Sequence, residues 1–261
     1  MNVHPSAGTV MLEHLPFETD AGIAARARLG LIVLATDYTV EHEYRQVLAR
    51  LPGVALYCAR IMNDNEITPE TLRAMEGRIV PIAKTLLPGC EFDVVAYGCT
   101  SASMVIGEER VMGLIRSVKP EAKATTPITA AFAAFRAFGA RRIGVLTPYT
   151  AAVNAQVQSY IEAAGFEIPV FGSFNEGQDP MVARITPDSV RAAARRIVEV
   201  GQIDALFVSC TSVRLLDAAA GIEAELGIPV TSSNHAMIWQ SLRLAGVDDT
   251  LDGLGRLYTL T

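Results

Sequence analysis

Two stretches of the chain, DVVAYGCTS at residues 93–101 and DALFVSCTS at residues 204–212, carry nearly the same pattern. In each, an aspartate precedes a short apolar run that ends near a Cys-Thr-Ser triplet. Near-continuous apolar runs of this length are typical of strands that are buried on both faces of a parallel sheet. The two stretches therefore predict two equivalent strands, each followed by a cysteine.

A second pair of motifs extends this similarity into a larger repeat. TDYT at residues 36–39 and TPYT at residues 147–150 are 111 residues apart, the same spacing that separates Cys99 from Cys210. Two motifs in one order at one spacing indicate a duplicated unit. A solenoid would need three or more copies, so two copies predict two pseudosymmetric lobes that face each other.

The chain between these motifs alternates between strand-like and helix-like patterns. Predicted strands are 29–34, 54–60, 94–97, 143–147, 168–171, 205–209 and 228–231. Predicted helices are 41–51, 70–86, 104–117, 128–138, 150–164, 188–200, 213–226 and 235–245. This order predicts an α/β fold in which each lobe is a parallel sheet flanked by helices, with the active site in the cleft between the lobes.

We expect three parts along the chain. Residues 1–27 lack a clear periodicity and form an N-terminal extension. Lobe 1 comprises residues 28–127 together with 234–261, because the last helix follows lobe 2 and is expected to pack back on lobe 1. Lobe 2 comprises residues 128–233.

Composition narrows the class of protein. Half of the 261 residues are hydrophobic, 19% are charged, and the net charge is −6. This composition argues against disorder, and the acidic balance argues against a nucleic-acid partner. We find no apolar stretch of membrane-helix length and no signal peptide, and we expect a cytoplasmic protein with reduced cysteines and no membrane partner.

Cys99 and Cys210 are the candidate catalytic residues. A cysteine at a strand end, close to a helix N-terminus, is in a position that favours the reactive thiolate. Two thiols on opposite sides of one carbon can remove a proton from one face and deliver a proton to the other. The same pair can instead add reversibly to a double bond and isomerise it. Neither reaction needs a cofactor, and the spacing of cysteines and histidines predicts no metal site.

Other polar residues near these strand ends are candidates for substrate binding. Hydroxyl and N–H groups of the two triplets are placed to bind a carboxylate or an enolate oxygen; these residues are Thr100, Ser101, Thr211 and Ser212. The polar cluster at 231–234 is a weaker candidate for lining the cleft. The loops at 63–66 and 175–179 are either lids or simple turns. Alternatively, each cysteine is only a small buried residue.

The chain resembles the Asp/Glu racemase superfamily, and within it the maleate cis–trans isomerases, the arylmalonate decarboxylases and the ectoine-utilisation proteins of the EutA type. The resemblance covers about residues 29–258. It depends on LGLIVLATDYTVE at 29–41, YGCTS at 97–101, GVLTPY at 144–149, VSCTS at 208–212 and GLGRL at 253–257.

The resemblance implies a cofactor-independent enzyme with its active site between two pseudosymmetric lobes. Cys99 and Cys210 match the catalytic pair of the superfamily, and Tyr149 matches a substrate-contacting tyrosine of the maleate isomerases. Arylmalonate decarboxylases keep only the second cysteine. Since this chain has both, it is more similar to an isomerase or a racemase.

Two positions depart from the maleate isomerase pattern. Asp37 and Asp179 stand where those enzymes carry asparagines that bind substrate carboxylate. Two anions would repel a dicarboxylate and would suit a substrate with an ammonium or amidinium group. Asp37 also resembles the strand-end aspartate of amino-acid racemases, and a simpler alternative is that it caps the following helix.

Our leading hypothesis is therefore a two-cysteine racemase or epimerase that acts on a small carboxylate or an amino-acid-like substrate. The segment TDYTVEHE at 36–43 favours an ectoine-derived substrate. The first alternative is a maleate-type cis–trans isomerase, and the second is a two-lobed protein that binds a small ligand without turnover. We also expect a homo-oligomer.

Overall fold

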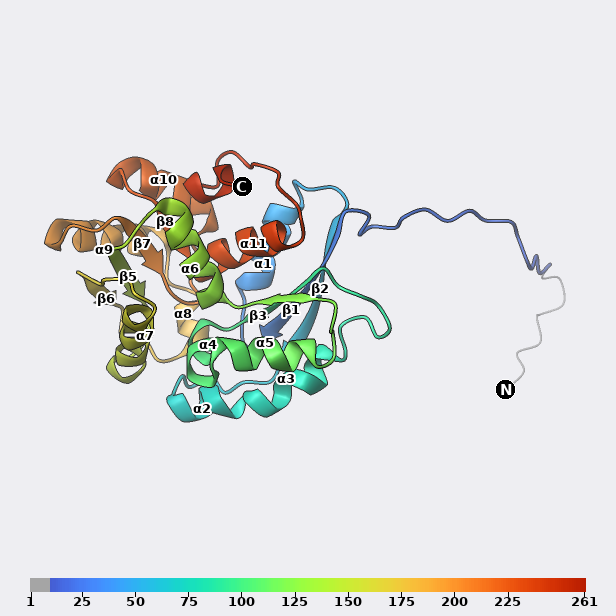
Figure 1. Cartoon of the computed structure of the whole chain (residues 1–261), viewed down its shortest axis with the longest axis horizontal. Helices are drawn as coiled ribbons and strands as arrows, with labels where there is room; N and C mark the ends of the chain where they lie inside the picture. The colour runs from blue at the N-terminus through green and yellow to red at the C-terminus, as the bar shows by residue number, and fades with distance from the viewer. Residues whose placement is uncertain (1–9) are drawn as a thin grey trace.

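The structure, a computed structural model, describes residues 10–261 and contains two parallel four-stranded sheets flanked by helices (Figure 1). Residues 1–9, the first part of the expected N-terminal extension, lie outside the described residues. Within residues 10–261, no helix is long and apolar enough to cross a membrane.

The first sheet has the strand order β2-β1-β3-β4. In chain order, the elements of this part are β1 (Ala27–Leu34), α1 (Val40–Leu48), β2 (Val54–Ile61), α2 (Pro69–Ala74), α3 (Glu76–Ala83), β3 (Val94–Gly98), α4 (Thr100–Ile106), α5 (Glu108–Arg116) and β4 (Lys123–Thr125). Alternate residues of β1 pack on opposite faces of the sheet. Leu31 and Val33 pack in one cluster with side chains of α1, whereas Ile32 and Leu34 pack with α3 and α5.

The second sheet repeats this order as β6-β5-β7-β8. Its elements are β5 (Ile143–Thr147), α7 (Ala151–Ala163), β6 (Phe171–Ser173), α8 (Asp179–Val182), α9 (Pro187–Val200), β7 (Ala205–Val208), α10 (Leu216–Leu226) and β8 (Val230–Ser232). Every neighbouring pair of strands in both sheets is parallel. The predicted α/β fold is confirmed, and the two equivalent strands of the sequence repeat are β3 and β7.

Two helices lie where the lobes meet. Helix α6 (Pro127–Phe138) contributes Ala130 and Ala134 to the cluster that contains β1, and Phe135 to the core around β5 and β7. Helix α11 (Ser233–Leu244) and the short 3₁₀ helix η1 (Arg256–Thr259) pack in the cluster around β1. We propose lobe boundaries at 28–127 with 234–261, and at 128–233.

The predicted helices at 104–117 and 213–226 differ from those observed. The first is divided into α4 and α5 by Gly107, whose φ of +98° is rarely adopted by residues with a side chain. The second begins only at Leu216, because a longer loop follows Cys210. The predicted helix at 70–86 is likewise two helices, α2 and α3, joined at Met75.

Three short elements also differ from the prediction. The strand expected at 168–171 lies at Phe171–Ser173, and β4 and α8 were not predicted. Each of these has only three or four residues, which is too short for hydrophobic periodicity to be recognised.

Residues 10–26 precede β1 and extend away from the sheets (Figure 1). Their large apolar side chains are strongly exposed; examples are Val10, Leu12 and Phe17. The segment joins the body at Arg26, whose N–H donates to the Gly53 carbonyl.

Candidate active site

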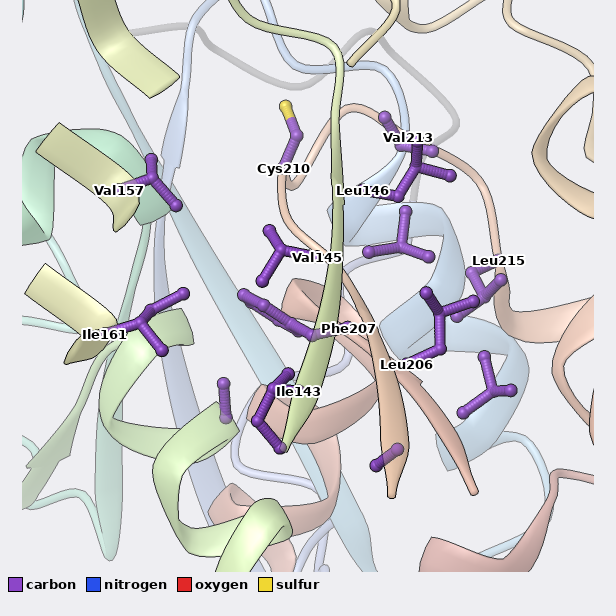
Figure 2. Packing of buried hydrophobic residues seen from close by; sticks show 14 of the residues in the cluster. Ile143, Val145, Leu146, Val157, Ile161, Leu206, Phe207, Cys210, Val213 and Leu215 are labelled. Carbon is purple, nitrogen blue, oxygen red and sulfur yellow. The ribbon is translucent and has the colours of Figure 1, made fainter. Parts of the chain in front are cut away.

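Cys99 and Cys210 line one cavity from opposite lobes. Cys99 follows β3 directly, and Cys210 lies two residues after the end of β7. Both are buried, with 4% of their surface exposed, and both line the same cavity. In Figure 2, the sulfur of Cys210 lies at one end of the packed side chains of β5 and β7 and points away from them. The fold therefore brings together the two cysteines that the repeat singled out.

The surroundings of the two cysteines are similar but not identical. Cys99 is the N-cap residue of α4, and its Sγ lies 3.9 Å from the Ser101 hydroxyl. Cys210 has no helix directly after it and adopts an unusual φ of +155°. The Tyr149 hydroxyl and the Ser212 main-chain N–H both lower the pKa of the Cys210 thiol.

Both thiols are predominantly protonated at neutral pH. Burial raises the pKa of the Cys99 thiol to about 12, and the Asp179 and Asp37 carboxylates raise it further. Burial, followed by the charge of Asp179, also raises the pKa of the Cys210 thiol. The N–H groups of Ala102 and Ser212 act in the opposite direction but are outweighed. The expectation that strand-end positions favour thiolates therefore does not hold, because burial outweighs the N–H groups at both cysteines.

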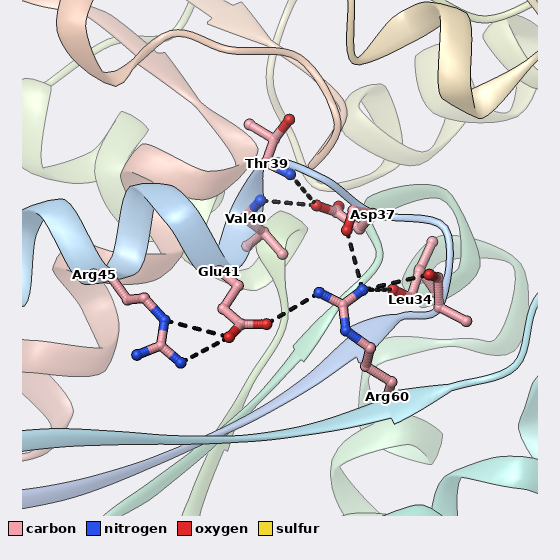
Figure 3. A network of polar contacts seen from close by, with 8 residues as sticks. Leu34, Asp37, Thr39, Val40, Glu41, Arg45 and Arg60 are labelled. Atoms are coloured by element: carbon pink, nitrogen blue, oxygen red, sulfur yellow. Dashed lines mark hydrogen bonds and ion pairs between the residues drawn. The ribbon is translucent and has the colours of Figure 1, made fainter.

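Asp37 lies behind the cavity at the start of α1. Its Oδ1 accepts hydrogen bonds from the N–H groups of Thr39 and Val40, at 2.6 and 2.8 Å (Figure 3). The N-cap residue of α1 is Thr39 and not Asp37, so the simple capping role does not hold, although the Asp37 carboxyl supports the start of the helix from two residues earlier. Arg60 donates to the Asp37 main-chain carbonyl at 3.1 Å and pairs with Glu41, so it makes no bond to the Asp37 carboxyl.

The second oxygen of Asp37 is unusual. Oδ2 is buried and has no hydrogen-bond partner among residues 10–261. Burial raises the pKa of Asp37 to about 7, against the Val40 and Thr39 N–H groups and the nearby Thr211 hydroxyl, which lower it. The carboxyl therefore changes charge in the neutral range, and this charge influences both Cys99 and Cys210.

Asp179, the first residue of α8, lines the cavity and connects the lobes. One carboxylate oxygen accepts from the Thr36 hydroxyl at 2.5 Å, and the other accepts from the Ser212 hydroxyl at 2.6 Å. Thr36 and Ser212 follow β1 and β7, so strand ends from both sheets converge on this carboxylate.

The predicted hydroxyl residues divide into two groups. Thr100, Ser101 and Thr211 line the cavity together with Tyr149, whereas Ser212 lies behind it on Asp179. The Thr100 hydroxyl donates to Ser233 at 2.7 Å. The Thr211 hydroxyl is 3.5 Å from the Gly98 carbonyl, which is a weak contact. The Ser101 hydroxyl lies beside a cysteine sulfur, 3.9 Å from Cys99 Sγ.

Two loops that the sequence left as lids or turns pair with each other beside the cavity. Glu66 and Gln178 form an antiparallel bridge, and the Ile67 N–H donates to the Gly177 carbonyl at 3.4 Å. Asn63 and Glu66 also line the cavity. The loops therefore join lobe 1 to lobe 2 at the site.

Thr36 and Ser233 were not predicted as individual site residues, whereas Asn63 belongs to the loop at 63–66 that was predicted to be a lid or a turn. The position of Thr36 at a strand end was a usable signal. Ser233 belongs to the polar cluster at 231–234, which is buried but does not line the cavity.

The fold and the site together define a class: two-lobed α/β proteins in which thiols from equivalent strands meet at one cavity. Within residues 10–261, no group of three His, Cys, Asp or Glu residues is arranged to hold a metal ion. The chain belongs to the arylmalonate decarboxylase family, whose sequence profile matches residues 29–258.

Relatives within this family have two named activities. The chain is 30% identical over 242 residues to a maleate isomerase of Nocardia farcinica, covering 88% of this chain and 94% of that protein. It is 25% identical over 246 residues to an arylmalonate decarboxylase of Bordetella bronchiseptica, covering 90% and 98%. These relatives are enzymes, which confirms the prediction of an enzyme family.

A solved structure of a relative has the same architecture. It is a cysteine-to-serine variant of the Nocardia farcinica maleate cis–trans isomerase, with a covalently bound succinylcysteine intermediate. It superposes with a TM-score of 0.78 at 28% identity and covers 89% of this chain and 98% of that one.

Proposed function

We propose that this protein is a cofactor-independent isomerase, a racemase or epimerase that inverts a carbon next to a carboxylate. One observation carries the proposal: two buried cysteines from equivalent strands line one cavity from opposite lobes. Inversion requires a proton acceptor and a proton donor on opposite faces of the carbon, and two thiols from opposite sides of one cavity can supply both.

The proposed reaction balances its protons without an external partner. One cysteine, as thiolate, takes the proton from the substrate carbon, and the resulting charge moves onto the carboxylate as an enolate. Ser101 and the N–H groups at the start of α4 are the donors placed to stabilise it. The opposite thiol then delivers its proton to the other face. Each turnover exchanges the protonation states of Cys99 and Cys210.

The substrate class follows from the carboxylates. Asp37 and Asp179 are buried, and their charges raise the pKa values of both cysteine thiols. A substrate with a positively charged group would offset these charges and would therefore make a thiolate easier to form. We propose an amino-acid-like substrate on this ground, with an ectoine-derived amino acid as one member to be tested.

Solvent exchange tests this proposal. Candidate amino acids are incubated with the enzyme in D₂O, and deuterium at Cα and inversion are followed by NMR and circular dichroism. Cys99→Ser and Cys210→Ser are each expected to slow inversion by about a hundredfold or more. Absence of exchange with every candidate, together with turnover of maleate, would contradict a racemase.

Asp37→Asn separates the substrate classes. It removes a negative charge, so it should reduce turnover of a cationic substrate more than turnover of maleate. Equal losses on both substrates would refute the charge argument.

A second candidate function is maleate-type cis–trans isomerisation, which the 30% identity to the Nocardia farcinica maleate isomerase favours. Here one thiolate adds to the double bond while the other thiol protonates the neighbouring carbon. Rotation about the new single bond, loss of that proton and expulsion of the thiolate give the trans product. Conversion of maleate to fumarate, with a cysteine adduct detected by mass spectrometry, would identify this reaction.

Two further expectations stay proposals. We propose a cytoplasmic location, where thiols remain reduced. We also propose that the protein is a homo-oligomer that acts on a small-molecule substrate. Cell fractionation and light scattering measure these properties directly.

A further inference from the structure

Ser233, the first residue of α11, contacts both cysteine loops at once. Its hydroxyl oxygen accepts a hydrogen bond from the Thr100 hydroxyl at 2.7 Å and another from the Cys210 main-chain N–H at 3.0 Å. Thr100 directly follows Cys99 in the chain. One buried hydroxyl therefore connects the two halves of the site, although Ser233 itself does not line the cavity.

The loop that carries Cys210 depends on such outside support. Its φ of +155° lies in a region that residues with a side chain rarely adopt, and such conformations persist only when the surroundings hold them. Ser233 holds the N–H of Cys210, and the next residue, Asn234, donates from Nδ2 to the Thr211 carbonyl at 2.8 Å. Two consecutive residues of α11 thus hold two consecutive residues of the loop.

Helix α11 is a rigid base for these contacts. The Ser232 hydroxyl accepts from the His235 N–H at 3.1 Å and so caps the helix. Further along, Met237 and Ile238 are completely buried in the cluster around β1. A displacement of the Cys210 loop relative to lobe 1 would therefore have to break the Ser233 contacts.

We propose that Ser233 is a positioning residue for the two-cysteine reaction, one that fixes Cys210 and the residue after Cys99 relative to each other. The proposal rests on the proposed function, because only a reaction that uses both thiols needs this alignment. Misplacement of a reacting group by about 1 Å can reduce the rate 10²-fold. The thiol environment that Ser233 maintains, however, can be measured without any substrate.

Replacing Ser233 should change the chemistry of Cys210. In Ser233→Ala, the Cys210 N–H loses its acceptor, and the loop is free to relax. The Ser212 N–H, which lowers the pKa of the Cys210 thiol, is then displaced relative to the sulfur and lowers this pKa less. Less thiolate is present at any given pH, so the thiol reacts more slowly.

The experiment compares Ser233→Ala with Ser232→Ala, the adjacent helix cap. Both variants lose one buried hydroxyl at the start of α11, but only Ser233 contacts the cysteine loops. Circular dichroism first confirms that both variants fold. Alkylation by iodoacetamide is then followed for Cys99 and Cys210 across a pH series by peptide mass spectrometry, with Cys58 as internal reference.

Ser233→Ala is expected to slow alkylation of Cys210 about three- to tenfold at fixed pH, as a shift of up to one pKa unit does. Its kcat should fall about ten- to a hundredfold while KM changes less. Ser232→Ala should leave the alkylation profiles of both site cysteines unchanged. Equal effects of the two variants on kcat, with unchanged alkylation of Cys210, would show a merely structural role and overturn the proposal.

Thr100 provides an independent check. Thr100→Ser keeps the hydroxyl that donates to Ser233, whereas Thr100→Val loses it. The double variant that combines Thr100→Val with Ser233→Ala should lose less activity than the product of the two single fold losses, because both substitutions remove the same contact. Full additivity would contradict the proposal. If the wild type turns over no tested substrate, the proposed function fails, but the alkylation comparison still decides the role of Ser233.

Discussion

The buried carboxyl of Asp37 makes the free energy of unfolding depend on pH. Burial raises the pKa of Asp37 to about 7 in the folded protein, compared with about 3.9 in an unfolded chain. The folded state therefore keeps a proton that the unfolded state loses, and the contribution of Asp37 to stability is full below about pH 4 and is lost as pH rises to about 7. Asp37→Asn keeps an oxygen for the Thr39 and Val40 N–H groups but has no charge. It should raise the free energy of unfolding by up to about 4 kcal/mol above pH 7, with no difference near pH 4.

Urea unfolding across this pH range measures the difference. Asp204 is the matched control, because its exposed carboxylate accepts from the N–H groups of Arg142 and Arg141, which lower its pKa. Its contribution to stability is present above the unfolded pKa and is lost at lower pH, so Asp204→Asn should destabilise the protein at neutral pH. A stability difference between Asp37→Asn and wild type that stays constant with pH would contradict the burial argument.

Individual site residues could be predicted where their position in the sequence, at the end of a strand, determines their position in the fold. Cys99, Cys210 and Asp37 each follow a strand of a parallel sheet, and such strand ends meet at one edge. Ser233 has no counterpart in the repeat, and its partner Thr100 is 133 positions away in the chain. Only the three-dimensional structure brings these two hydroxyls together.

At the scale of elements, the junction between α4 and α5 is set by one glycine. Gly107 has a φ of +98°, and a Cβ added there would meet no atom within 4 Å. Gly107→Ala therefore tests backbone conformation alone, without a steric clash. It should lower the free energy of unfolding by about 1–3 kcal/mol, because an alanine is strained in this region.

Gly113, inside α5, is the control, because alanine there should change the free energy of unfolding in the opposite direction. A Cβ there also meets no atom within 4 Å, and the backbone is helical. Gly113→Ala should raise the free energy of unfolding by about 0.5–1 kcal/mol. Thermal and urea unfolding measure both variants. Similar changes in both would show that Gly107 is not conformationally required.

Most elements followed from hydrophobic periodicity, but their ends did not. The predicted helix at 104–117 continues its pattern across Gly107, because periodicity registers the buried face and not the backbone angle. The start of α10 was also misplaced, because Glu43 on α1 accepts hydrogen bonds from the N–H groups of Leu215 and Leu216 at 3.0 Å. A cap supplied by a distant helix leaves no local signal.

At the scale of the whole molecule, Glu43 is a buried connection between the lobes. One carboxylate oxygen caps α10 in lobe 2 through Leu215 and Leu216, and the other accepts from Asn234 Nδ2 at 2.8 Å. Asn234 in turn holds the Thr211 carbonyl, so the contact continues to the active-site loop. Burial raises the pKa of Glu43, and the three donors around the carboxylate oppose this rise.

Removing this carboxylate should therefore weaken the whole fold. Glu43→Ala leaves the N–H groups of Leu215 and Leu216 and one amide hydrogen of Asn234 buried without their acceptor, which should lower the free energy of unfolding by roughly 2–4 kcal/mol. Glu41, two residues earlier on α1, makes only partly exposed ion pairs with Arg45 and Arg60. Glu41→Ala should change the free energy by about 1 kcal/mol or less. Urea unfolding compares the two variants with wild type. Equal losses would mean that the buried bonds of Glu43 do not join the lobes more strongly than a surface ion pair does.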